Sequence, residues 1–238
     1  YAVPEGTVIF PYEPVITVKA PAAEAQLIET FLLLCINHQS VIATKANRIV
    51  RSAEGRPVME FGSRRAQGIS AAVIGARAAY IAGCVATACT LTDQLYGVPA
   101  AGTMAHSWVQ MFDTEYEAFK FYMETYPNNA ILLVDTYNTL KSGIPNAIRV
   151  FKEYLAKGGK LDNYGIRLDS GDLSYLTKKA RAMLDEAGLQ DAKIVASNSL
   201  DEHLIKELLR QGAKIDAFGV GERLITSQTS PVFGGVYK

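Results

Sequence analysis

Short apolar runs that end in small or polar residues, each followed by a helical stretch, occur seven times along the chain. This repeat of strand, polar turn and helix is typical of parallel sheets, whose strands are joined by helical crossovers. Because parallel strands all end at one face, groups distant in the sequence are expected to meet around one pocket there. The seven junctions begin at Glu60, Gly83, Gly102, Val134, Arg167, Ala196 and Gly219.

The spacing of these runs predicts an α/β fold, an irregular or incomplete parallel α/β barrel over residues 57–238. The run Ile131–Val134 is continuously apolar, as a strand buried on both faces should be. A doubly wound open sheet is the structural alternative, although the chain has neither a Gly-x-Gly-x-x-Gly turn nor a Walker loop. Strands are predicted to start near residues 58, 84, 100, 131, 164, 193 and 217. Helices are predicted over residues 66–82, 107–125, 144–156, 172–187 and 201–210.

Residues 1–56 are predicted to form a flanking segment of β-sheet and helix. The β-branched runs at 7–10 and 15–18 are separated by prolines, which indicates edge strands of a small sheet. The helix is expected from Ala22 to about Arg51. The chain opens without Met and ends at Lys238 with no stop signal, so we expect both ends to be cut from a longer protein.

The composition excludes several classes of partner. Lys plus Arg and Asp plus Glu both number 24, so nothing predicts a nucleic-acid or membrane-surface partner. No signal peptide and no apolar run of bilayer length is visible. The odd number of cysteines and their lack of a disulfide or metal-ligand spacing indicate a reducing, cytoplasmic location and no protein-held metal. The three cysteines are Cys35, Cys84 and Cys89.

The junction that begins at Arg167 carries the most charge. An arginine within a buried strand must meet an anion or line a cavity, because burying an unpaired charge is prohibitive. Asp169 and Asp172 could bind Mg²⁺ or ribose hydroxyls; the alternative is a salt-bridged helix cap with Ser170 or Asp169 as the N-cap. His106 lies among small residues, where an imidazole can serve as a base, a polarising group or a phosphoryl acceptor, or simply as a hydrogen-bonding residue.

Three further junctions are candidates for ligand binding. Phe61 and Arg64 could stack on an aromatic ring and pair with its carboxylate or phosphate; the alternative is a core phenylalanine beside surface arginines. Ser197 with Asn198, and the turn Gly219–Glu222, follow the last two predicted strands. Barrels often hold phosphate there through backbone N–H groups, and ordinary turn chemistry is the alternative.

Taken together, these stretches resemble the nicotinate phosphoribosyltransferase family, and the resemblance covers nearly the whole chain. That family implies a type II phosphoribosyltransferase fold, an irregular α/β barrel with a sheet domain beside it. Its members transfer phosphoribose from phosphoribosyl pyrophosphate to the ring nitrogen of nicotinate, form nicotinate mononucleotide for NAD salvage, and couple this to ATP hydrolysis. The matching motifs are Glu29–Asn37, Ala43–Ala46, Phe61–Gly68, Gly102–Ser107, Asp135–Asn138, Ile166–Asp172 and Phe218–Ser227.

The resemblance also implies roles for individual residues. His106 corresponds to the family's phosphorylated histidine and, with Arg167 and Asp169, is expected to be catalytic. Phe61 would stack on the pyridine ring, Arg64 and Arg167 would hold the anionic groups, and Asp169 would bind ribose hydroxyls. Mg²⁺ would arrive on the pyrophosphate. The remaining residues expected to bind substrate, chiefly around the 5′-phosphate, are Ser170, Ser197, Asn198, Gly219, Gly221 and Glu222.

Substrate choice and assembly also follow from the resemblance. The similar nicotinamide-specific enzymes place an acid after the second strand, whereas the segment from Gly83 to Thr90 contains none, which favours nicotinate. Family members act as homodimers with shared active sites, and their length exceeds that of this chain. The alternatives are a nicotinamide or quinolinate phosphoribosyltransferase and a non-catalytic phosphate-binding barrel.

Overall fold

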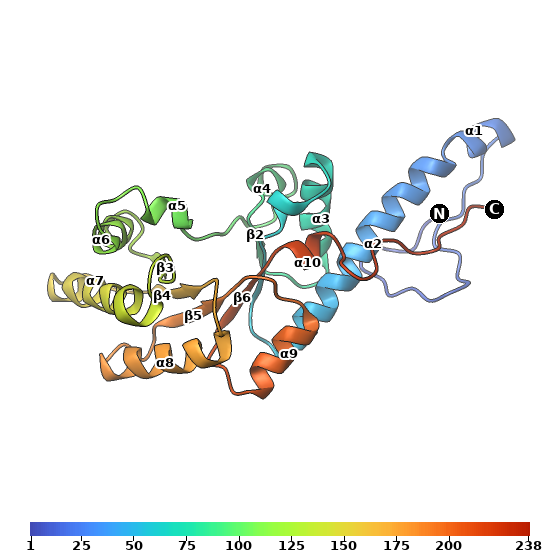
Figure 1. Ribbon diagram of the computed structural model, residues 1–238. Helices are drawn as coiled ribbons and strands as arrows, with labels where there is room; N and C mark the ends of the chain where they lie inside the picture. The colour runs from blue at the N-terminus through green and yellow to red at the C-terminus, as the bar shows by residue number, and fades with distance from the viewer.

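In the computed structural model, which describes residues 1–238, six strands form one sheet in the order β2-β1-β6-β5-β4-β3 (Figure 1). Every neighbouring pair is parallel, so all the carboxyl ends lie at the same edge. We call this edge the rim. The strands are β1 Val58–Glu60, β2 Ala86–Thr87, β3 Asn129–Leu133, β4 Asn163–Leu168, β5 Lys193–Ala196 and β6 Ala217–Val220.

The strand order distinguishes the predicted barrel from the doubly wound alternative. From β3 to β6 and on to β1 and β2, each strand pairs with the next, and the ring is open only between β2 and β3. A doubly wound sheet would instead reverse its winding at a central strand. The sheet is therefore a curled half-barrel, which confirms the prediction of an incomplete α/β barrel.

The strand predicted at residues 100–103 does not form. Only an isolated parallel bridge joins Ala100 to Thr87. It consists of two hydrogen bonds, from the N–H of Thr87 to the carbonyl of Pro99 (3.0 Å) and from the N–H of Ala101 to the carbonyl of Thr87 (2.9 Å). Pro99 has no N–H group to extend the ladder. The segment nevertheless crosses the open side of the half-barrel, because the hydroxyl of Thr103 accepts a hydrogen bond from Arg167 on β4.

Helices connect the strands, and local capping explains several of their starts. Asp172 accepts a hydrogen bond from the backbone of Tyr175 and is the N-cap of α8, so the alternative of a cap at Ser170 or Asp169 does not hold. Asp201 caps α9 in the same way. The helix predicted at 144–156 has those bounds as α7. Between β1 and β6 the helical elements are η1 Ser63–Arg65, α3 Ile69–Ile81, α4 Thr90–Tyr96, α5 His106–Val109, α6 Glu115–Thr125, η2 Thr139–Gly143, α7 Ile144–Ala156, α8 Leu173–Glu186 and α9 Glu202–Arg210; α10 Glu222–Ile225 follows β6.

The single helix predicted over residues 107–125 is wrong, because the structure has two helices there. The short α5 begins at His106 without a side-chain cap. The α6 helix begins after Thr114, whose hydroxyl accepts a hydrogen bond from the backbone of Glu117 while the Glu117 carboxylate accepts from the backbone of Thr114. This reciprocal capping box restarts the helix and separates it from α5.

The small flanking sheet predicted in the first twenty residues does not form either. One isolated antiparallel bridge joins Ala2 to Ile16, and two hydrogen bonds from Arg77 on α3 to Glu5 (2.7 and 2.6 Å) tie this segment to the barrel. The prolines at 11 and 14 lie between the two runs and have no N–H group, so neither run can extend its ladder into the turn.

The expected helix of the flanking segment is present, divided into α1 Ala22–Leu27 and α2 Glu29–Ser52. The second half of α2 packs into the barrel core through Ile42, Ala46 and Ile49. The C-terminal segment of the chain returns to these helices (Figure 1), and Tyr237 donates a hydrogen bond to the carbonyl of Ala25 on α1 (2.7 Å). The domain division at residue 56 stays a prediction.

The core lies between the sheet and its covering helices. Residues 131–134 are all buried, as expected for a strand covered on both faces, and Phe119, Phe151 and Phe218 are fully enclosed. This burial supplies the main driving force that holds the strand ends, and hence the rim, in place. None of the helices combines the length and apolar character that crossing a bilayer requires.

Candidate functional site

Polar side chains from separate junctions meet at the rim in one hydrogen-bonded network, which we call the rim cluster. They follow β3, β4 and β5, or belong to the segment that crosses the open side of the half-barrel. The members are Thr103, His106, Asp135, Arg167, Asp169, Ser170 and Ser197.

Arg167, near the end of β4, donates in three directions. Its Nε binds the hydroxyl of Ser197, one terminal nitrogen binds the hydroxyl of Thr103, and the other binds the carboxylate of Asp169, each at 2.8 Å. The side chain is only 16% exposed, and Asp169 is the anion that this position was expected to require. A guanidinium held so rigidly presents its positive charge in one fixed orientation.

Asp135 joins the histidine to this network. Its side chain is 1% exposed, and one carboxylate oxygen lies 3.1 Å from Nε2 of His106. The other oxygen accepts hydrogen bonds from the backbone N–H of Asp169 (2.8 Å) and the hydroxyl of Ser170 (2.6 Å). Asp135 therefore fixes the position of the imidazole, which is itself 41% exposed, relative to the charged end of β4.

Asp135 was not among the predicted site residues. Its signal in the sequence was its place directly after the buried run Ile131–Val134, where a carboxylate must emerge at the rim. Thr103 was also missed, because hydroxyl residues are frequent in turns and only the contact with Arg167 sets this one apart.

Phe61 follows β1 and brings an aromatic ring to the cluster. The ring centroid lies 5.5 Å from the guanidinium carbon of Arg167, within the range of a cation–π interaction. Gly219 on β6 lies beneath the ring, since a Cβ atom there would come within 2.5 Å of two ring carbons. The glycine thus leaves the space that the ring occupies.

The predicted phosphate-binding residues lie at the ends of β5 and β6. Ser197 is buried and also donates a hydrogen bond to Asp169, so it belongs to the rim cluster. Asn198 and Ser199 follow with φ values of 82° and 50°, a left-handed backbone that non-glycine residues adopt at some cost. Gly221 directly precedes α10, and the carboxylate of Glu222 pairs with Arg65 at 3.4 Å.

The structure does not bring the guanidinium of Arg64 into the rim cluster. Arg64 lies on the single turn η1, its side chain is exposed, and it takes part in no ion pair or side-chain hydrogen bond. It follows Phe61 by three residues in the sequence, and its charge is available to a ligand.

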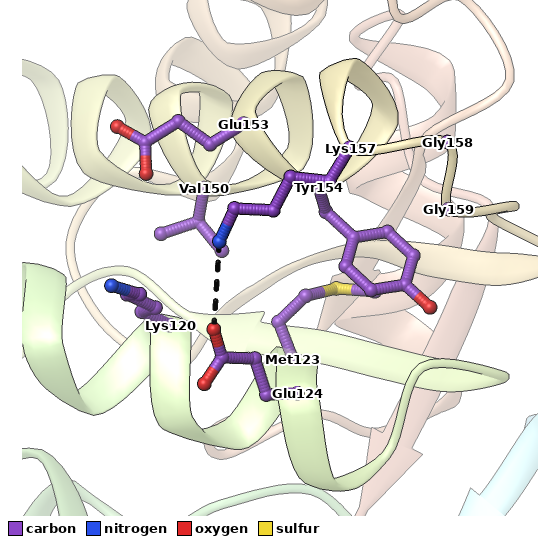
Figure 2. Close-up of a pocket in the computed structure, with 9 residues that line it drawn as sticks. All are labelled: Lys120, Met123, Glu124, Val150, Glu153, Tyr154, Lys157, Gly158 and Gly159. Atoms are coloured by element: carbon purple, nitrogen blue, oxygen red, sulfur yellow. Dashed lines mark ion pairs between the residues drawn. The ribbon is translucent and has the colours of Figure 1, made fainter.

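A separate pocket lies between α6 and α7 and contains none of the predicted site residues (Figure 2). Its walls carry both charges, and Lys157 pairs with Glu124 across it at 3.9 Å. The chemistry-bearing residues are at the rim instead. No group of three or more histidine, cysteine, aspartate or glutamate side chains is arranged to hold a metal ion.

Comparisons with known proteins agree with the resemblance. Residues 57–233 match the sequence profile of the nicotinate phosphoribosyltransferase (NAPRTase) family. The nicotinate phosphoribosyltransferase of Bacillus subtilis (strain 168) is 52% identical over 238 residues, which are 100% of this chain and 48% of that protein. The chain spans about half the length of the curated relatives it matches.

Two solved structures are similar over most of the chain. Nicotinate-nucleotide pyrophosphorylase from Pyrococcus furiosus is 33% identical with a TM-score of 0.82, over 95% of this chain and 57% of that one. Human nicotinic acid phosphoribosyltransferase is 28% identical with a TM-score of 0.78, over 92% of this chain and 54% of that one.

Proposed function

Because the chain belongs to the nicotinate phosphoribosyltransferase family, we propose that the protein transfers phosphoribose from phosphoribosyl pyrophosphate to nicotinate. The products are nicotinate mononucleotide and pyrophosphate, and the reaction serves NAD salvage. The observation that carries this proposal is the rim cluster, in which Arg167 and Asp169 present opposite charges beside the ring of Phe61.

The geometry suits a dissociative transfer at the ribose anomeric carbon. As pyrophosphate leaves, positive charge develops on the sugar and negative charge on the leaving group, so catalysis depends on positioning and electrostatics. Asp169 holds ribose hydroxyls, and Arg167 holds an anionic group. Phe61 stacks on the pyridine ring, while Arg64 pairs with its carboxylate. The 5′-phosphate lies against Ser197 and the turn before α10, within reach of backbone N–H groups.

His106 is the residue through which we propose that ATP hydrolysis is coupled to transfer. Its imidazole is part-exposed at the rim, and Asp135 holds Nε2 in place. An imidazole that is both oriented and accessible can accept a phosphoryl group from ATP. The phosphorylated form would add negative charge next to the ribosyl site and drive turnover away from equilibrium.

We propose that Mg²⁺ enters bound to the pyrophosphate oxygens of the substrate. The two rim carboxylates, Asp135 and Asp169, are already engaged by hydrogen bonds, and no third ligand of their kind accompanies them. Mg²⁺ commonly keeps its waters and bridges phosphates in this way rather than occupying an all-protein cage.

The proposed setting follows from the family. The protein acts in the cytoplasm as a homodimer with shared active sites, and its partners are small molecules rather than nucleic acid or membrane. Sedimentation of the full-length protein with and without nicotinate mononucleotide measures the assembly.

Comparing three pyridines tests the substrate. With phosphoribosyl pyrophosphate and Mg²⁺, the full-length protein is expected to turn over nicotinate with a kcat/KM about 100-fold above that for nicotinamide or quinolinate, since a mismatched charge in the site is costly. A preference for either of the other two would reassign the substrate. If calorimetry shows phosphoribosyl pyrophosphate binding that nicotinate mononucleotide does not displace, the protein is a non-catalytic phosphate-binding barrel.

Gly219→Ala tests the place of the aromatic ring. The added methyl group would displace Phe61, so the KM for nicotinate is expected to rise about tenfold, the loss typical of one misplaced contact. Gly234→Ala is the matched control, because a Cβ atom at Gly234 meets no atom within 4 Å. Steady-state kinetics with each substrate varied in turn measures the effect. An unchanged KM in Gly219→Ala would remove Phe61 from the nicotinate site.

A further inference from the structure

Glu60, the last residue of β1, is an acid that the proposed mechanism does not use. It is 0% exposed, although it immediately precedes Phe61 at the rim. One carboxyl oxygen accepts a hydrogen bond from the backbone N–H of Gly62, and the other accepts one from the hydroxyl of Thr87 on β2 (2.6 Å). The hydroxyl of Thr87 in turn accepts from the backbone N–H of Cys89 (2.9 Å). One side chain thus joins the turns that follow two neighbouring strands.

No cation neutralises this carboxyl group. None of the chain's ion pairs includes Glu60. Burial raises the pKa of Glu60, and the hydrogen bonds from Thr87 and Gly62 only partly oppose this shift. Burial, together with the nearby Glu60, also raises the pKa of the Cys84 thiol to about 12. Glu60 therefore depends on its two hydrogen bonds, rather than on an ion pair, for its place in the core.

The bond to Gly62 sets the start of the turn that carries the predicted pyridine ligands. Gly62 is the residue before η1, and Phe61 and Arg64 lie on either side of it. A Cβ atom at Gly62 would come within 2.7 Å of the side chain of Ile225 and of the Gly221 carbonyl, so the backbone is packed closely on its other side. The turn is therefore held by the hydrogen bond from Gly62 to Glu60 and by close packing of Gly62 against Ile225 on α10.

We propose that Glu60 is a positioning residue for the pyridine half of the site, which it builds by fixing the turn from Phe61 to Arg64 against β2. This inference rests on the proposed function, since it assigns that turn to nicotinate. The groups that hold phosphoribose belong to β4, β5, the rim cluster and the turn before α10, and Glu60 makes no hydrogen bond to any of them. Loss of Glu60 should therefore affect one substrate and spare the other.

The test compares Glu60→Ala with Glu60→Gln in the full-length protein. Glu60→Ala is expected to raise the KM for nicotinate about tenfold, as an unsatisfied buried donor would, and to leave the KM for phosphoribosyl pyrophosphate within about twofold. In Glu60→Gln the side-chain oxygen can still accept from the N–H of Gly62, and the amide NH₂ group can donate to the hydroxyl oxygen of Thr87. Its KM for nicotinate is therefore expected to stay within about threefold of the parent. Hydrogen exchange at the Gly62 amide should accelerate in Glu60→Ala and not in Glu60→Gln.

Glu115→Ala is the matched control, because Glu115 is also a buried acid that accepts side-chain hydrogen bonds, from Ser142 and Asn146, but lies on α6. It should lower stability without separating the two KM values. If Glu60→Ala does not fold, Thr87→Val tests the same proposal, because it removes the hydroxyl that donates to Glu60. Its KM for nicotinate is expected to rise about threefold.

Equal changes in both KM values, an unchanged KM for nicotinate, or a Gly62 amide that stays protected would each overturn the proposal. A parent protein that does not use nicotinate would instead contradict the proposed function. The Gly62 amide would still report whether Glu60 holds the turn.

Discussion

Replacing Arg167 by lysine is expected to lower kcat/KM for phosphoribosyl transfer by about 1,000-fold, roughly 4 kcal/mol of transition-state stabilisation. Lysine keeps the positive charge but loses the fork that donates at once to Thr103, Asp169 and Ser197. Asp169 and Ser197 would then lose the partner that orients them toward the sugar. Hydrogen bonds from a charged donor are worth about 1.5–3 kcal/mol each, so loss of the fork accounts for an effect of this size. Initial rates at substrate concentrations well below KM measure it.

Arg181→Lys is the control for this substitution. Arg181 on α8 also donates in three directions, to Asp185 and to the carbonyls of Leu189 and Ala192, and its side chain is similarly buried, at 19% exposed. Its bonds hold a helix to the following loop, and none of them involves a member of the rim cluster. It should lose stability comparable to that of Arg167→Lys while keeping its activity. If both variants keep full activity, Arg167 does not hold the substrate.

Replacing His106 by alanine is expected to abolish phosphate incorporation from ATP. The ratio of the transfer rates with and without ATP should fall to about one, because the nucleophile of the covalent step is gone. Transfer without ATP should continue, since Arg167 and Asp169 remain. Incubation with γ-labelled ATP and measurement of both rates check this result. Label retained by the His106→Ala protein, or an unchanged stimulation by ATP, would show that the coupling does not pass through this residue.

His203→Ala is the control, because His203 is 87% exposed on α9 and its nearest carboxylate, that of Glu202, lies 3.9 Å away. It should incorporate label as the parent does. The comparison separates phosphorylation at the rim from adventitious labelling of an accessible imidazole.

The sequence predicted which residues meet at the rim to the extent that strand ends could be recognised. His106, Arg167, Asp169, Ser170 and Ser197 each follow or end an apolar run, and the parallel sheet brings them to one rim, where they bond to one another. Asp135 was not predicted as a site residue, although it too directly follows a buried apolar run. Its importance lies in having two oxygens directed at two different segments, and no local pattern encodes a pair of partners.

For Glu60 and Arg64 the sequence did not predict which side chain is buried and which is exposed. The resemblance pointed to Arg64, which the folded chain leaves exposed on η1. The preceding acid, Glu60, drew no attention, because a glutamate next to a strand is usually solvated. Its burial depends on Thr87, 27 residues later in the chain, which supplies the hydroxyl that makes a buried carboxyl group tolerable.

The sequence by itself determined the elements whose causes are local. The buried run Ile131–Val134, the caps at Asp172 and Asp201, and the winding of strand and helix are written in neighbouring residues, since periodicity and capping act within one or two turns. The tertiary structure decided which strand was missing, which carboxylates were shared and why Gly219 lies beneath Phe61. Those outcomes depend on the register between strands and on contacts such as that between Arg167 and Thr103, 64 residues apart, which only the closing of the sheet brings within hydrogen-bonding distance.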